Sequence, residues 1–268
     1  MSTTAFIGGG NMARALVGGL RRAGRPGREI VVVDPDPAQR AQLEAEFGVR
    51  TLAAADEMLR DVTLLVWAVK PQYFKAAAAQ VTPHLRAALQ LSVMAGIRSG
   101  AIAAATGSER VVRAMPNTPA LIGQGISGLY ARAGVDPAGR TAVEAVLAPT
   151  GRLLWFEREA DLDAVTALSG SGPAYVFFFA EAMVRAAIEM GLSEAQGREL
   201  ALATFAGASA LAQGSADPLD VLRERVTSKG GTTHAAITAL QRDRVDAAFV
   251  GALKAARDRA VELGDEFG

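Results

Sequence analysis

In the N-terminal part of the chain, short apolar runs alternate with segments in which apolar residues recur at helical spacing. The runs predict strands over residues 5–7, 29–33, 62–69, 91–94, 111–114, 126–130 and 152–155. The helical segments are 11–23, 37–47, 74–89 with a break at Pro83, 99–105 and 137–147. Strands that alternate with helices are typical of a parallel sheet covered on both faces. Residues 1–160 are therefore expected to form an α/β domain.

Beyond about residue 160 the pattern is helical throughout. One long segment covers 162–190 and is interrupted by Gly-Ser-Gly-Pro at 170–173. Further helices are predicted over 194–213, 218–225, 232–241 and 245–263. The change is a shift in composition and not a flexible linker. We expect an all-α C-terminal domain over residues 161–268.

The helix after Pro173 indicates a partner subunit. Its charged residues, Glu181, Arg185 and Glu189, are spaced by four and form one stripe, while almost every other position is apolar. A helix that is apolar nearly all round must be buried nearly all round, and a small domain can hardly achieve this alone. A second copy of the chain is the expected cover, which makes this a dimerisation domain. The alternative is the central helix of a monomeric bundle.

Composition removes several classes of function. The 268 residues carry 28 Lys plus Arg and 28 Asp plus Glu, and this balance argues against nucleic acid as the main partner. There is no cysteine and there are only two histidines, so thiolate chemistry and a multi-histidine metal site are excluded. No run is apolar enough for a membrane span, and the N-terminus lacks the pattern of a signal peptide. These features favour a cytoplasmic protein.

A glycine-rich turn predicts a dinucleotide site. Residues 8–13, Gly-Gly-Gly-Asn-Met-Ala, follow a strand and open a helix, and they fit the Gly-x-Gly-x-x-Ala fingerprint. Gly8 permits the tight turn, Gly10 lets a pyrophosphate approach the backbone, and Ala13 permits close packing of helix on strand. The helix N-terminus then offers amides to the phosphate. The α/β domain is accordingly expected to be of the Rossmann type.

The residue at the end of the second strand bears on the choice of cofactor. Asp34 lies 26 residues after Gly8, where an acidic side chain accepts hydrogen bonds from the adenosine ribose and repels a 2′-phosphate. This favours NADH over NADPH. Two alternatives stay open, because Arg40 is near enough to meet a phosphate and Asp34 could instead form a turn or cap the helix that starts at Pro37.

The remaining polar residues suit a substrate that is already electrophilic. No strong acid–base pair is visible, and a protonated imine accepts hydride without one. Lys70 follows the strand 62–69 at the edge where such sheets bind ligands; the alternative is a solvated strand end. In the C-terminal half, hydroxyls and glycines gather over 225–234 just before a helix, an arrangement that favours a carboxylate ligand. The alternative there is an ordinary helix cap at Thr232 or Thr233.

Taken together, the motifs resemble the pyrroline-5-carboxylate reductase family. The matching segments occur in the family's order over residues 6–241, and they are 6–12 (FIGGGNM), 68–71 (AVKP), 113–119 (RAMPNTP), 168–175 (LSGSGPAY) and 226–233 (VTSKGGTT). The resemblance implies reduction of 1-pyrroline-5-carboxylate to L-proline with NADPH or NADH and no metal. It also implies a homodimer of interlocked helical domains, which in this family often assembles into a decamer.

The resemblance also implies which residues form the site. The cofactor would be held by Ile7, Gly8, Gly9, Gly10, Asn11, Met12, Asp34, Asp36, Ala68, Val69, Lys70, Pro71, Met94, Ala95, Gly96 and Asn117. The substrate pocket would consist of Val226, Ser228, Gly230, Gly231, Thr232 and Thr233. Thr233 would lie at the pyrroline nitrogen and is the candidate catalytic residue.

The sequence departs from the family's pattern at two positions, and two other functions are weighed against the one that the resemblance implies. Lys229 replaces a frequent proline, and Met94 replaces a small residue and is expected to crowd the cofactor. The β-hydroxyacid dehydrogenases share the architecture but need a catalytic lysine where this chain has Val176, which cannot move a proton. A non-catalytic nucleotide sensor would keep the glycine turn but would have no use for the hydroxyl cluster before Thr233.

Overall fold

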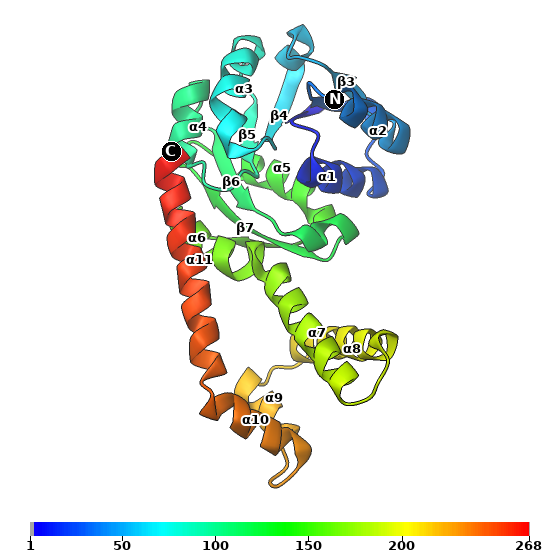
Figure 1. Ribbon diagram of the computed structural model, residues 1–268. Helices are drawn as coiled ribbons and strands as arrows, with labels where there is room; N and C mark the ends of the chain where they lie inside the picture. The colour runs from blue at the N-terminus through cyan, green and yellow to red at the C-terminus, as the bar shows by residue number, and fades with distance from the viewer. Residues whose placement is uncertain (1–2, 268) are drawn as a thin grey trace. The chain divides into compact units, whose positions relative to one another are not determined.

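The computed structural model describes residues 3–267 and divides into two compact units (Figure 1). The sheet unit comprises residues up to Ser171 together with the C-terminal stretch from Ala256. The helical unit comprises Gly172–Ala255. The sheet unit thus extends beyond residue 160, because the helical turns that follow residue 160 pack on the sheet. It also includes the C-terminal part of the last helix.

The sheet unit is built on one eight-stranded sheet in the order β3-β2-β1-β4-β5-β6-β7-β8. The strands are β1 (Thr3–Ile7), β2 (Ile30–Val33), β3 (Arg50–Leu52), β4 (Val62–Trp67), β5 (Leu89–Ser92), β6 (Val111–Met115), β7 (Gly125–Ala131) and β8 (Gly151–Trp155). Strands β2 and β3 lie in turn on one side of β1, and the next strand, β4, lies on the other side of β1. This reversal creates the switch point at which such sheets bind ligands.

Helices cover both faces of the sheet, as the alternating pattern predicts (Figure 1). The helices of this unit are α1 (Asn11–Arg22), α2 (Pro37–Phe47), α3 (Phe74–Val81), α4 (Ser99–Thr106), α5 (Pro137–Leu147) and α6 (Asp161–Val165). One buried cluster joins the sheet to α1, α2 and α5, and includes Phe6, Leu16 and Val143. The other joins it to α3 and α4, and includes Trp67, Phe74 and Ile102.

The expectation of a parallel sheet is wrong for one pairing. Strand β7 runs antiparallel to β6, while β8 runs parallel to β7. The connection from β6 to β7 contains only a short 3-10 turn at Thr118–Ile122. A parallel neighbour needs a crossover of a dozen or more residues, so this short connection returns the chain in the opposite direction.

Two local predictions also differ from the structure. The helix predicted over 74–89 ends at Val81, and the strand predicted at 91–94 is β5 at Leu89–Ser92. The helix ends because Pro83 stands in the 3-10 turn at Thr82–His84 that follows it. The start of β5 was missed because Gln90 is polar, yet it is buried inside the strand, where its side chain accepts a 2.8 Å hydrogen bond from Trp67 Nε1. Strand β3 has only three residues and was not predicted.

The helical unit contains α7 (Gly172–Glu189), α8 (Glu194–Gln213), α9 (Leu219–Arg225), α10 (Thr232–Arg242) and the first part of α11 (Val245–Phe267). A π-helical turn at Thr166–Gly170 precedes α7, at the predicted Gly-Ser-Gly interruption. α7 and α8 pack closely, since a Cβ on Gly197 would lie 2.8 Å from the Cβ of Ala187. Among residues 3–267, no helix combines the length and apolar character needed to cross a membrane.

Candidate active site

The loop between β1 and α1 has the conformation that a bound pyrophosphate requires. Gly8 has a φ of +98°, and a Cβ there would lie 2.7 Å from the carbonyl oxygen of Ala68. A Cβ on Gly10 would meet no atom of residues 3–267 within 4 Å, so the backbone is open to a ligand. Helix α1 begins at Asn11 without a side-chain cap, which leaves its first amides available to phosphate oxygens. The loop therefore fits a dinucleotide.

The carboxylate of Asp34 braces this loop. Its Oδ2 accepts a 2.7 Å hydrogen bond from the amide of Gly9, and its Oδ1 accepts one of 2.8 Å from the amide of Asp36. Asp36, and not Asp34, caps helix α2. Arg40 Nη1 donates to the carbonyl oxygens of Asp34 and Pro35, at 2.8 and 2.9 Å. The turn after β2 thus holds the carboxyl group of Asp34 and the guanidinium of Arg40 close together.

A cleft of about 670 Å³ lies at the carboxyl ends of β1, β2 and β4, at the switch point of the sheet. The cofactor residues predicted from the sequence that line it are Ile7, Gly8, Gly10, Asp34, Asp36, Ala68, Val69 and Lys70. Gly9, Asn11, Met12 and Pro71 are their chain neighbours and are not part of the lining. Tyr73, which is 59% exposed, and Gln39 also line the cleft, and neither was predicted from the sequence. The signal in the sequence for Tyr73 was an aromatic residue two positions after Pro71, beyond the end of a predicted strand.

Four further residues assigned to the cofactor lie outside this lining. Met94, Ala95 and Gly96 follow β5, and Asn117 follows β6. The side chain of Met94 is 3% exposed and belongs to the core, so it does not crowd the cleft as its bulk led us to expect. Asn117 Oδ1 accepts a 3.0 Å hydrogen bond from the amide of Ile126, which fixes the orientation of its side chain.

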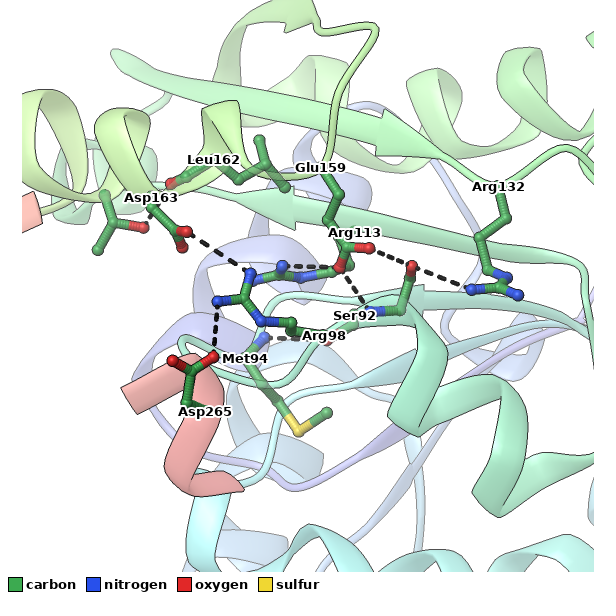
Figure 2. A network of polar contacts seen from close by, with 11 residues as sticks. Ser92, Met94, Arg98, Arg113, Arg132, Glu159, Leu162, Asp163 and Asp265 are labelled. Carbon is green, nitrogen blue, oxygen red and sulfur yellow. Dashed lines mark hydrogen bonds and ion pairs between the residues drawn. The ribbon is translucent and has the colours of Figure 1, made fainter. Parts of the chain in front are cut away.

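A polar network that the sequence did not reveal anchors the start of α4 (Figure 2). Glu159 accepts hydrogen bonds from the amide and hydroxyl of Ser99, at 2.6 and 2.5 Å, and from Arg113 Nη1 at 2.8 Å. Burial raises the pKa of the Glu159 carboxyl, but these hydrogen bonds and the charge of Arg113 outweigh burial and hold the pKa below its ordinary value. The carboxylate therefore stays ionised and caps α4 from a distant segment.

In the helical unit, the turn before α10 presents unpaired donors. Gly231 is the N-cap of α10 and no side chain caps the helix, so the alternative of a cap at Thr232 or Thr233 is wrong. Gly230 has a φ of +75°, and a Cβ on Gly231 would lie 2.6 Å from Ser228 Oγ, which explains both glycines. Within residues 3–267 the hydroxyls of Thr232 and Thr233 have no hydrogen-bond partner. Together with the first amides of α10, they can bind an anion.

The helical unit also exposes much apolar surface. Phe177 and Phe178 on α7 are 57% and 63% exposed, so α7 is not the central helix of a monomeric bundle. An apolar groove between α7 and α8 is lined by Phe177, Val184 and Ile188 and is edged by charged side chains. Surfaces of this kind mark contact sites with another chain.

The fold and the cleft define an oxidoreductase of the dinucleotide-binding class. Residues 3–96 match the family described as NADP oxidoreductase, coenzyme F420-dependent. Residues 159–263 match the family described as pyrroline-5-carboxylate reductase dimerisation. In the part of the chain that the structure describes, no group of three or more potential ligand side chains could hold a metal ion.

Relatives over the full length identify the family. The chain is 44% identical to a pyrroline-5-carboxylate reductase of Pseudomonas aeruginosa, over 98% of this chain and 97% of the relative. It superposes on the structure of a pyrroline-5-carboxylate reductase from Coxiella burnetii with a TM-score of 0.91 and 34% identity, over 98% of both chains. The Plasmodium falciparum enzyme, solved with NADP bound, gives 0.88 and 27%, again over 98% of both. The chain belongs to the pyrroline-5-carboxylate reductase family.

Proposed function

We propose that this protein reduces 1-pyrroline-5-carboxylate to L-proline with NAD(P)H, the last step of proline synthesis. The observation that carries the proposal is the family match from end to end, with both the glycine loop and the turn at 226–233 present. The reaction forms a C–H bond at the imine carbon, and the π electrons of the C=N bond pass to the nitrogen, which keeps its proton as an amine. A bound NAD(P)H supplies the hydride.

The N-termini of two helices supply the anion contacts that this reaction needs. The amides at the start of α1, behind Gly8 and Gly10, bind the pyrophosphate. The amides and hydroxyls at the start of α10, from Ser228 to Thr232, bind the substrate carboxylate. Because a protonated imine is already electrophilic, no residue has to act as a strong acid.

Thr233 donates a hydrogen bond to the nitrogen as it changes from planar to tetrahedral. Thr233→Val keeps the shape and removes the hydroxyl, and the loss of an orienting bond worth ~1.5–3 kcal/mol should lower kcat/KM roughly ten- to a hundredfold. Since Gly231 caps α10, the Tm should not change. Thr233→Ser should retain most activity, and Thr238→Val on the same helix is the matched control. Wild-type kcat/KM in folded Thr233→Val would refute this role.

The cofactor preference that we propose is NADH. In this proposal the side chain of Asp34, which lines the cleft after β2, meets the adenosine ribose and repels a 2′-phosphate. The guanidinium of Arg40 is held against the carbonyl oxygens of Asp34 and Pro35 by the hydrogen bonds of its Nη1. Steady-state kinetics with NADH and NADPH side by side test this preference directly.

For assembly we propose a homodimer or a multiple of it, up to the decamer, in the cytoplasm. The exposed phenylalanines of α7 and the family match of residues 159–263 support the dimer. The larger assembly rests on the family resemblance alone. Sedimentation of the purified protein at micromolar concentration separates the dimer from the decamer.

The decisive experiment is oxidation of NADH or NADPH by the purified protein in the presence of 1-pyrroline-5-carboxylate, with proline identified as the product. A protein that binds the dinucleotide but does not turn over would be the non-catalytic sensor. No turnover with the imine, together with turnover of a β-hydroxyacid, would favour the dehydrogenase class instead.

A further inference from the structure

The loop that follows β5 is fastened at several points within the sheet unit. The amide of Val93 donates a 3.0 Å hydrogen bond to the carbonyl oxygen of Trp67, which places the loop beside the end of β4. The side chains of Met94 and Ile97 are buried in the core. Gly96 has a φ of +73°, and a Cβ there would lie 3.2 Å from the Cβ of Leu263 on α11. The backbone of the loop and the last turns of α11 are therefore in close contact.

Arg98 closes the loop with a bridge between two carboxylates (Figure 2). Its Nη1 lies 3.6 Å from Asp163 Oδ2, and its Nη2 lies 3.3 Å from Asp265 Oδ1. Asp163 is buried, so Arg98 supplies the charge that a buried carboxylate needs. The guanidinium lies flat on Gly264, where an added Cβ would come within 2.7 Å of Arg98 Nη2. The absence of a side chain at Gly264 is what allows the bridge to form.

The position of this loop relates it to the cofactor cleft. In the proposed function the adenosine lies at Asp34 after β2 and the pyrophosphate lies at the glycine loop after β1, and both of these segments line the cleft. A dinucleotide that spans the switch point therefore extends its nicotinamide end toward β4 and β5. The loop 93–98 follows β5 on this side. Any movement of its backbone would change the shape of the nicotinamide end of the site.

We propose that Arg98 is a positioning residue for the cofactor: by joining Asp163 to the end of α11, it fixes the backbone of residues 94–96 in the geometry that accepts the nicotinamide ring. The inference rests on the proposed function only in so far as that function requires a nicotinamide dinucleotide. Neither Arg98 nor Gly264 is placed in direct contact with the cofactor or the substrate.

The sharpest test is Gly264→Ala, because it displaces the Arg98 guanidinium without removing its charge and at the same time favours the helix. The binding of NADH and NADPH to the substrate-free protein is measured by fluorescence titration, alongside kcat, both KM values and Tm. We expect the Kd and KM for the preferred dinucleotide to rise about three- to tenfold, with the KM for 1-pyrroline-5-carboxylate within twofold of wild type. Arg98→Ala should give the same increase, and the double variant should add nothing to it.

Gly251→Ala on α11 is the matched control, because a Cβ there would meet no atom of the described residues within 4 Å. It should leave Kd and KM unchanged. Wild-type dinucleotide Kd in folded Gly264→Ala, or additive effects in the double variant, would overturn the proposal; if Arg98→Ala does not fold, Gly264→Ala alone decides. A wild-type protein that binds the dinucleotide but does not reduce the imine would refute the proposed function and leave this measurement valid.

Discussion

Glu159→Gln should destabilise the sheet unit, and the structure gives the size of the effect. The substitution keeps one acceptor oxygen and turns the other into a donor that faces Ser99 or Arg113, both of which are donors themselves. Arg113, only 4% exposed, then lacks its carboxylate partner. Breaking a fully buried pair costs about 3–5 kcal/mol. Water reaches Glu159, whose side chain is 21% exposed, and we therefore expect a loss of about 2–3 kcal/mol.

The stabilisation by Glu159 should depend on pH, and the direction of its pKa shift tells in which range it is lost. Because the folded-state pKa of Glu159 is lowered, its ionised form adds stability that is complete above the unfolded-state pKa of about 4.3. That contribution disappears as the pH falls through the lowered folded-state value. The difference between wild type and Glu159→Gln should therefore be constant from neutral pH down to about 5 and should narrow below about 4.3.

Thermal and urea unfolding from neutral to acidic pH measure both quantities. At roughly 2–4 °C per kcal/mol for a domain of this size, the expected fall in Tm at neutral pH is about 5–10 °C. Glu157→Gln is the matched control, since Glu157 is exposed and lies two residues away. Equal Tm values for the two variants, or a difference that does not change with pH, would show that the network does not stabilise the fold in this way.

Two further predictions concern specificity and assembly. Asp34→Ser should shift the ratio of kcat/KM values toward NADPH, measured by steady-state kinetics; a wild type that already prefers NADPH tenfold, a gap of ~1.4 kcal/mol, would refute the role of Asp34. Phe178→Glu should give aggregated or unfolded chain in sedimentation experiments, since an unpaired charge would enter the proposed contact between copies. A stable wild-type monomer at micromolar concentration would contradict this second prediction.

Elements with strong local signals could be predicted with their boundaries. Helix α2 was expected at 37–47 and occupies Pro37–Phe47, because Asp36 caps it and Gly48 ends it in the left-handed conformation. The glycine turn was found for the same reason, since the φ of +98° at Gly8 is a property of that residue's own backbone. A signal that depends only on neighbouring residues can be read from one sequence.

Features that depend on distant partners could not be predicted in this way. The direction of β7 follows from the short connection that precedes it, not from its own pattern. Gln90 looks unsuited to a buried strand until its bond with Trp67, 23 residues away, is known. Glu159 meets Arg113 and Ser99 across 46 and 60 residues, and no periodicity links them. For such residues the structure supplies the partner and hence the role.

In the C-terminal helix, a glycine that locally disfavours helix marks a contact with a residue distant in the sequence. The sequence predicts that this helix ends at Leu263, immediately before Gly264. In the structure α11 continues through Gly264 to Phe267, although alanine would favour a helix interior more than glycine does. The cost in helix propensity is explained by the guanidinium of Arg98, which occupies the space that a Cβ at Gly264 would need. A glycine inside a helix therefore indicates a close approach by another segment. Here that segment contains Arg98, at the end of the loop 93–98 that we propose to lie beside the nicotinamide ring.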